Sequence, residues 1–527
     1  MRTKRREILK AGLGAGSLFL PLPYAWVWAQ SDGAMKLLRA PKVALVVGNG
    51  KYKDAPELKN APNDAKAIAE ALKGSGFAVT MLLDSGRDAL VQAIRDYVNG
   101  MEKQKAVGLF YFAGHGVQLE WRNYMLPIDA VIDKLEDVAK QSVDVARLME
   151  GLTKAANPMN VIILDACREN PFGTAKPVAQ KGLSQMDAPT HTILAYATSP
   201  GNVASDGDGA NGLYTENLLR EIKVPEAKIE DVFKRVRLGV RRTSKGVQIP
   251  WESTSLEEDF WFLPPKELKK LSDAEKEKAF DAELKLWESI RESKVPGPLE
   301  DYLRRYPGGE YTELAQLQLD KVLAQHGEKR VEIAAQKGNP YTQGTIRADT
   351  DFKVGDFYEV RFLDPGTKAE RRRLRPEVVK VTDTEVHFST GLILDRMGNT
   401  RRTPDGVVFT DNQNMPLEFQ IGHRWTTKYR TYPPSVPSHI RIMTEMDYRI
   451  TGREKIQVPA GTFDCFRVEG RGQDIAPKGT VDIASVTWWA SERVRRPVAF
   501  EQMRKPQSGS VAPGGSVRIE LVTYKQS

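Results

Sequence analysis

The sequence contains very little cysteine, because among its 527 residues only Cys167 and Cys465 carry a thiol. Histidine is also scarce, and neither cysteine has another Cys or a His at the short spacings that zinc-binding motifs use. A multi-disulfide scaffold and a structural zinc site are therefore excluded. Two alternatives remain: one disulfide between the two thiols, or one reactive thiol and one buried thiol.

The chain also lacks a strong charge bias. It has 77 Lys and Arg against 69 Asp and Glu, which leaves a net charge of +8, and both signs are spread along its length. A dedicated nucleic-acid binder concentrates its basic residues, so we expect no nucleic-acid partner. With 41% hydrophobic and 8% aromatic residues, the chain is neither disordered nor polytopic in a membrane. At about 150 residues per domain, its length predicts three to four domains.

One apolar run stands apart at the N-terminus. Residues 1–10 are basic, residues 11–22 are apolar and contain glycine, and small residues precede a cleavage position after Ala29. This pattern predicts that residues 1–29 are an export signal. The pair Arg5 and Arg6 indicates the twin-arginine type, with an ordinary secretory signal or an uncleaved anchor as alternatives. We expect the mature chain to lie in the bacterial periplasm or cell envelope.

Between residues 40 and 263, short apolar runs alternate with segments whose apolar residues recur every three or four positions. The runs predict six strands: Val43–Val47, Val79–Leu83, Val107–Phe112, Val161–Leu164, Ile193–Ala197 and Phe260–Leu263. In the segment after the first strand, Ala65, Ile68, Ala69 and Leu72 form one apolar helix face. The alternation is typical of an α/β domain with a largely parallel, six-stranded sheet flanked by helices.

Two further parts follow this domain. Residues 266–328 are rich in Lys, Glu, Leu and Ala with proline breaks, which predicts two or three antiparallel helices that resemble the hairpins of tetratricopeptide-like repeats. Residues 336–527 contain Val, Thr, Tyr, Phe and Trp runs separated by Gly, Pro and Asp. They predict an antiparallel β domain, which could contact an envelope partner.

Reactive side chains follow two of the predicted buried strands. The third strand is expected to end three residues before His115, which lies between Gly114 and Gly116. The fourth strand runs directly into Asp165 and Cys167. Because α/β sheets bind their ligands at the carboxyl ends of the strands, we expect His115 and Cys167 to share one edge. The two glycines allow close approach of a ligand to the backbone.

Cys167 lies 52 residues after His115. Four motifs occur in a fixed order around this pair: Ala44–Asn49 with Tyr52, Phe112–Gly116, Asn123–Asp129 and Asp165–Arg168. Their types, order and spacing resemble the caspase-like peptidases, in which the Cys follows the His by about 50 residues, whereas papain-type enzymes place the Cys first. Within that fold, the Asp-x-Cys-Arg-x-Asn run resembles the paracaspase and prokaryotic orthocaspase branch. The resemblance covers residues 40–263, under half of the chain.

The chemistry of a thiol explains why both residue types are needed. A Cys with a pKa of about 8.5 is mostly protonated at neutral pH, so an imidazole must accept its proton. Cys167 is then the nucleophile, and His115 activates it and protonates the leaving amine. The resemblance also assigns the oxyanion hole to the backbone N–H groups of Gly116 and Cys167. The alternatives are a catalytically inactive scaffold or binding protein of the cell envelope, and another thiol hydrolase.

The resemblance implies an acidic S1 pocket for a basic P1 side chain. Asp64 and Asp165 match pocket positions of paracaspases and metacaspases, and Asp206 is a third candidate. By itself, Asp64 is equally well explained as a carboxylate near a helix N-terminus. We therefore expect protein or peptide substrates cleaved after Arg or Lys. Lys181, followed by the small Gly182, is the candidate for self-cleavage in the loop between the fourth and fifth predicted strands.

No cofactor is expected from the motifs. Gly48 and Gly50 begin a dinucleotide-type loop, but Lys53 stands where its third glycine is required. The acidic stretch from Asp206 to Gly209 lacks the spacing of an EF-hand, so a calcium site has no support beyond its presence in some metacaspases. No metal site is predicted.

Overall fold

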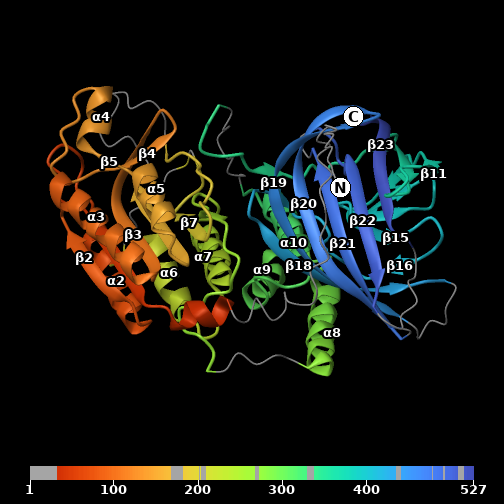
Figure 1. Cartoon of the computed structure of the whole chain (residues 1–527), viewed down its shortest axis with the longest axis horizontal. Coiled ribbons are helices and arrows are strands. Elements are labelled where there is room, and N and C mark those ends of the chain that lie inside the picture. The colour runs from red at the N-terminus through yellow and green to blue at the C-terminus, as the bar shows by residue number, and fades with distance from the viewer. Residues whose placement is uncertain are drawn as a thin grey trace, which may run out of the picture.

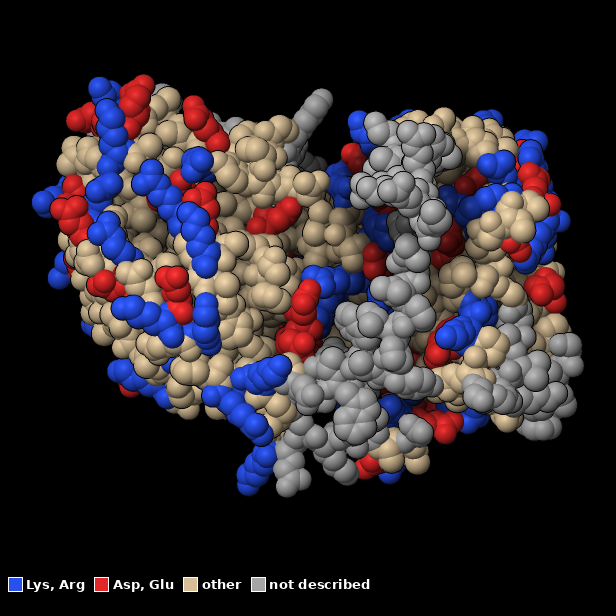
Figure 2. Space-filling model, viewed as in Figure 1, with Lys and Arg blue, Asp and Glu red and all other residues tan. Residues whose placement is uncertain are grey.

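A computed structural model describes residues 33–167, 182–200, 202, 209–266, 272–328, 338–434, 441–477, 479–490, 493–507 and 515–527. An α/β part and a large β part lie side by side, with helices of the middle segment between and below them (Figure 1). On the face shown in Figure 2, basic and acidic side chains are interspersed over both parts. Of the described helices, none is both long and apolar enough to cross a membrane.

The α/β part contains a largely parallel sheet, which confirms the predicted fold class. Its main strands are β1 Lys42–Gly48, β2 Ala78–Leu83, β3 Val107–Leu119, β6 Met159–Cys167, β7 Thr192–Tyr196 and β8 Trp251–Thr254. They lie in the order β2-β1-β3-β6-β7-β8, and only the β7–β8 pair is antiparallel. Two short strands, β4 Arg122–Met125 and β5 Val143–Asp144, extend β3 by antiparallel pairing.

Helices cover both faces of this sheet. They are α2 Ala61–Gly74, α3 Arg87–Gln104, α4 Leu135–Gln141, α5 Val145–Ala155, α6 Leu213–Ile222 and α7 Ile229–Thr243. Helices α2, α6 and α7 pack on the face that contains Leu109 and Tyr111 of β3, and α3 and α5 pack on the face that contains Phe110 and Phe112. Since successive strand residues point to opposite faces, strands covered on both sides need continuous apolar runs.

The prediction of the sixth strand is wrong, because Phe260–Leu263 does not form a ladder with another strand. The strand next to β7 at the edge of the sheet is β8 instead. Phe260 and Phe262 are buried as an aromatic cluster with Phe77, so their apolar character reflects core packing alone. The sequence of β8, Trp-Glu-Ser-Thr, is mostly polar and gives a weak strand signal.

The predicted end of the third strand is also wrong, since β3 continues through His115 to Leu119. Beyond His115, Gly116–Leu119 pair with β4, and this second ladder keeps the backbone extended. Glycine has a low strand propensity, so the Gly-His-Gly sequence suggested a loop. His115 therefore lies inside a strand rather than after one.

The described residues after this domain form three helices and a β domain. The helices are α8 Asp273–Ile290, α9 Pro296–Arg305 and α10 Thr312–Gln325. The strands are β9 Ile346–Arg347, β10 Phe357–Leu363, β11 Glu370–Leu374, β12 Val378–Val381, β13 Glu385–Phe388, β14 Ile393–Asp395, β15 Thr400–Arg402, β16 Val408–Phe409, β17 Glu418–Phe419, β18 Arg424–Tyr432, β19 Ile442–Val458, β20 Gly461–Ala476, β21 Gly479–Trp489, β22 Ala499–Pro506 and β23 Val517–Lys525. Thirteen of them form one antiparallel sheet, and β9 pairs with β17.

Cys465 lies in the core of this β domain. Its thiol is free and the residue has no exposed surface, as expected for a cysteine that packs as a small apolar side chain. Burial raises the pKa of this thiol to about 12. Cys465 is therefore unreactive in the folded protein.

Candidate active site

The register of β3 against β6 brings His115 and Cys167 together. Their parallel ladder ends with the pairs Gly114↔Ala166 and His115↔Cys167. Neighbouring strands lie about 4.8 Å apart, so the two backbones are adjacent where the ladder between β3 and β6 ends. The side chain of Cys167 lies outside the described part of the structure. The shared edge expected for these two residues is thus present in the backbone.

The imidazole of His115 is held by two neighbours from the segment after β1. Its Nε2 lies 2.8 Å from the backbone oxygen of Pro56, and its ring centroid lies 4.6 Å from that of Tyr52. A carbonyl can only accept, so Nε2 carries a hydrogen, and in the neutral ring the lone pair is then on Nδ1. Nδ1 is the atom able to take a proton. His115 is 4% exposed, which shields it from bulk water.

Tyr52 also fixes the backbone of the site, since its hydroxyl oxygen accepts a 2.8 Å hydrogen bond from the N–H of His115. Gly114 makes this approach feasible, because a Cβ at that position would lie 2.5 Å from the Tyr52 hydroxyl oxygen. The sequence placed Tyr52 in a motif but assigned it no role. The role of the Pro56 carbonyl could not be predicted from the sequence, because every residue has a backbone carbonyl.

Two polar side chains anchor the start of the segment that contacts the imidazole. Asn49 has no exposed surface; its amide donates to the backbone oxygen of Leu126 at 3.1 Å and accepts from the N–H of Ser85 at 2.9 Å. Asp84 accepts from the N–H of Gly50 at 2.8 Å. These bonds restrict the chain that positions the ring.

The structure places Asp64 in the first turn of α2, with 3% of the residue exposed. Its Oδ1 accepts hydrogen bonds from the side-chain amide of Asn211 at 2.8 Å and from the N–H of Gly212 at 3.0 Å. Both donors come from the segment leading into α6. Asp64 therefore ties the first turn of α2 to the segment that leads into α6.

Asp165 lies two residues before Cys167 on β6. Its Oδ2 accepts from the Thr215 hydroxyl at 2.6 Å and from the Tyr111 hydroxyl at 3.1 Å. Burial, then the charges of Asp165 and Asp64, raise the pKa of Tyr111. The charges of both carboxylates thus reach the phenol of Tyr111, which lies on the face of the sheet that α2 and α6 cover. The sequence analysis did not identify Tyr111 and Thr215, because the sequence indicates only that one lies in a strand and the other in a helix.

Gly116 is packed too tightly to carry a side chain. A Cβ there would lie 2.9 Å from Cβ of Ala166 and 3.1 Å from Cδ2 of Leu183. Asp206 and Lys181 lie outside the described residues. In the part of the chain that the structure describes, no group of three or more His, Cys, Asp and Glu is arranged to hold a metal ion.

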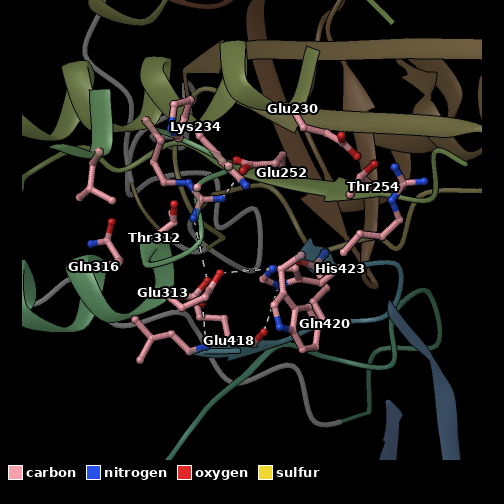
Figure 3. A pocket seen from close by; sticks show the side chains of 18 of the residues that line it. Glu230, Lys234, Glu252, Thr254, Thr312, Glu313, Gln316, Glu418, Gln420 and His423 are labelled. Carbon is pink, nitrogen blue, oxygen red and sulfur yellow. Dashed lines mark hydrogen bonds and ion pairs between the residues drawn. The ribbon is translucent and has the colours of Figure 1, made fainter. Parts of the chain in front are cut away.

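A cleft of about 1700 Å³ lies away from this site, where α7 and β8 face α9, α10 and the β domain (Figure 3). Charged side chains from the three parts line it and pair across it. Arg237 of α7 contacts Glu252 of β8 and lies 4.0 Å from Glu418 of the β domain, and His423 lies 3.5 Å from Glu313. Of the described site residues, neither His115, Asp64 nor Asp165 lines this cleft.

A largely parallel sheet in which a His inside β3 pairs with the Cys that ends β6 is the arrangement that the resemblance to caspase-like α/β domains implies. Residues 41–261, which make up less than half of the chain, match the family model described as the caspase domain. This confirms the resemblance seen in the motifs.

Curated relatives agree with this assignment. The chain is 27% identical over 227 residues to the human mucosa-associated lymphoid tissue lymphoma translocation protein 1, and equally to its mouse homolog. Each match covers 42% of this chain and 26% of the relative. The chain thus spans about a quarter of the length of these relatives.

Proposed function

We propose that this protein is a cysteine endopeptidase in which Cys167 is the nucleophile and His115 is the general base and acid. The observation that carries the proposal is the backbone pairing of His115 with Cys167, the last pair of the ladder between β3 and β6. The match of residues 41–261 to the caspase domain family model supports it. An imidazole with its lone pair on Nδ1 next to a thiol is the minimum set for thiolate chemistry.

In the reaction, Nδ1 of His115 takes the thiol proton, and the thiolate attacks the carbonyl carbon of the scissile peptide. The backbone N–H groups of Gly116 and Cys167 donate to the oxyanion. The imidazolium then protonates the leaving amine as the C–N bond breaks, which leaves a thioester. Water, deprotonated by His115, hydrolyses the thioester and restores the thiol. The Pro56 carbonyl strengthens its bond to Nε2–H while the ring is charged.

The same proposal includes cleavage after Arg or Lys. Asp64 and Asp165 provide two carboxylates near Tyr111, and Asp206 is proposed as a third. A guanidinium or ammonium that leaves water needs such partners, whereas an acidic P1 side chain meets like charge. The reaction needs no cofactor, since the thiol and imidazole supply nucleophile and base.

The test is hydrolysis of fluorogenic peptides with Arg, Lys or Asp at P1 by the purified chain, beside Cys167→Ala. We expect turnover of the Arg and Lys peptides, none of the Asp peptide, and none by the variant. Equal turnover by both proteins contradicts the mechanism. A folded wild-type chain without turnover instead supports the inactive scaffold as the function.

We further propose export through residues 1–29 to the periplasm or cell envelope, where the β domain contacts an envelope partner. Cell fractionation tests this, with Arg5→Lys and Arg6→Lys together as the variant. We expect wild-type protein in the periplasmic fraction and the variant in the cytoplasm. Export of the variant to the same extent contradicts a twin-arginine signal.

A further inference from the structure

The chain between the helices and the β domain returns to the caspase-like domain. Residues 339–345, here called the connecting segment, come after α10 and lead into β9. They pack along residues 183–188, here called the pre-β7 segment, which lie in sequence between Cys167 and β7. About 155 residues separate the partners in sequence, as in the Asn339 to Ser184 contact. A piece of the C-terminal half is therefore in direct contact with the peptidase domain.

Six hydrogen bonds join the two segments. Asn339 Nδ2 donates to Ser184 Oγ (2.9 Å) and to the Gln185 oxygen (2.8 Å), the Asp187 N–H donates to the Tyr341 oxygen (2.9 Å), Thr342 Oγ1 and the Gln343 N–H donate to the Asp187 carboxylate (2.7 Å each), and Gln185 Nε2 donates to Thr345 Oγ1 (2.8 Å). Both backbone and side chains take part, so the contact specifies one register. Asn339 is buried, and a buried donor that loses its acceptors is costly.

The pre-β7 segment in turn touches the strands of the active site. Ser184 and Asn123 exchange two hydrogen bonds, of 2.7 and 2.9 Å. Asn123 belongs to β4, which pairs with β3 directly after His115. Leu183 is buried in the same core as Ala166, the residue before Cys167. The pre-β7 segment therefore packs against β4, which pairs with β3 after His115, and shares a core with the residue that precedes Cys167 on β6.

The connecting segment also enters this core. The ring of Tyr341 packs against it, and the guanidinium of Arg122 lies 5.4 Å from the centre of that ring. Arg122 is itself held by an ion pair with Asp144 between β4 and β5. The contact thus continues from the connecting segment through β4 to the backbone of His115.

Elsewhere the caspase-like domain and the C-terminal half face each other across the cleft of Figure 3 and touch beside it, as where Arg424 donates to the backbone oxygen of Leu256 at 3.0 Å. Ion pairs at its border, such as Arg241 with Asp320 at 2.6 Å, join α7 to α10 but do not approach the dyad. A contact that reaches β3, β4 or β6 can transmit order to the active site directly. Among the described residues, the connecting segment makes such a contact.

We propose that the connecting segment is a positioning element of the peptidase. By holding the pre-β7 segment through Asn339 and Asp187, it keeps Gly116 and the His115–Cys167 pair in the arrangement that the reaction requires. The C-terminal half is then part of the catalytic apparatus and not only a separate binding domain. This inference rests on the proposed function.

The test uses the full chain with Asn339→Ala or Asp187→Asn. Asn339→Ala removes two hydrogen bonds between the segments, Asp187→Asn replaces one of the two acceptor oxygens of the carboxylate by a donor group, and neither variant changes a group of the dyad. We expect kcat for an Arg peptide to fall about tenfold or more while KM changes less than about threefold. Amide hydrogen exchange of residues 183–188 should become faster. Arg241→Gln, which breaks the ion pair at the cleft, is the matched control and should keep kcat within about twofold.

A second measurement does not depend on turnover. The rate at which iodoacetamide alkylates Cys167 reports its thiolate, and we expect both variants to slow it about as much as they lower kcat. The proposal is overturned if amide hydrogen exchange of the pre-β7 segment becomes faster in a variant while its peptide turnover and its alkylation of Cys167 stay unchanged. An equal loss in Arg241→Gln also overturns it, because domain docking in general would then be the cause.

If the wild-type chain hydrolyses no peptide, the proposed function fails, and alkylation of Cys167 still decides the positioning role. Circular dichroism of each variant separates loss of fold from loss of position. If Asn339→Ala does not fold, the test uses Asp187→Asn, because this change retains the shape of the side chain.

Discussion

Replacing Asp165 by Asn tests the S1 pocket directly. The change keeps the shape of the side chain but removes its charge, at a site where Thr215 and Tyr111 donate to Oδ2 at 2.6 and 3.1 Å. The amide oxygen still accepts a bond, so we expect the free energy of unfolding to fall by only about 1 kcal/mol. A charged hydrogen bond to an Arg at P1 contributes about 1.5–3 kcal/mol. At about 1.4 kcal/mol per tenfold, kcat/KM for Arg peptides should fall about 10- to 100-fold.

The assay compares kcat/KM for two peptides that differ only at P1, one with Arg and one with Gln. In the wild-type protein the Arg peptide should be strongly preferred, and in Asp165→Asn the preference should nearly vanish while the Gln peptide is turned over at a similar rate. Glu252→Gln is the matched control, since Glu252 is a partly buried carboxylate of the same domain that pairs with Arg237 outside the site. An unchanged ratio of Arg to Gln turnover in Asp165→Asn would refute the acidic pocket.

Four further predictions come from the sequence and the structure. His115→Ala should abolish hydrolysis and slow alkylation of Cys167 without changing the circular dichroism spectrum; retained turnover would contradict its role. Near pH 8 the native protein should react with one equivalent of iodoacetamide, at Cys167, because the buried Cys465 has a pKa of about 12. A second equivalent should react only after unfolding. Reaction of two equivalents with the native chain would contradict the burial of Cys465. If the chain cuts itself, Lys181→Ala should remove that cut, as gel electrophoresis after incubation will show. Burial, then the charge of Glu283, raises the pKa of Glu310 from 4.5 to about 8. The folded state then binds more protons than the unfolded state between these values, so stability should fall as pH rises from about 4.5 to 8, and Glu310→Gln should flatten this dependence of the melting temperature.

The pattern of apolar residues was sufficient to predict the central strands of the sheet and the candidate dyad. The strands β1, β3, β6 and β7 are covered by helices on both faces, so their burial appears as continuous apolar runs that need no knowledge of their partners. His115 and Cys167 could be paired because each follows such a run, and parallel strands end at a common edge. β8 was missed because an antiparallel edge strand can be largely polar.

What the sequence determined by itself is therefore local: which segments are buried, which residues can react, and the order of the motifs that resemble caspase-like peptidases. Tertiary structure alone decided the contacts between distant segments. The carbonyl of Pro56 holds the imidazole only because β1 lies beside β3, and Asn339 reaches Ser184 only through the packing of the connecting segment. Backbone carbonyls and single polar side chains have no periodicity, so their partners are set by how the elements pack and not by neighbouring residues.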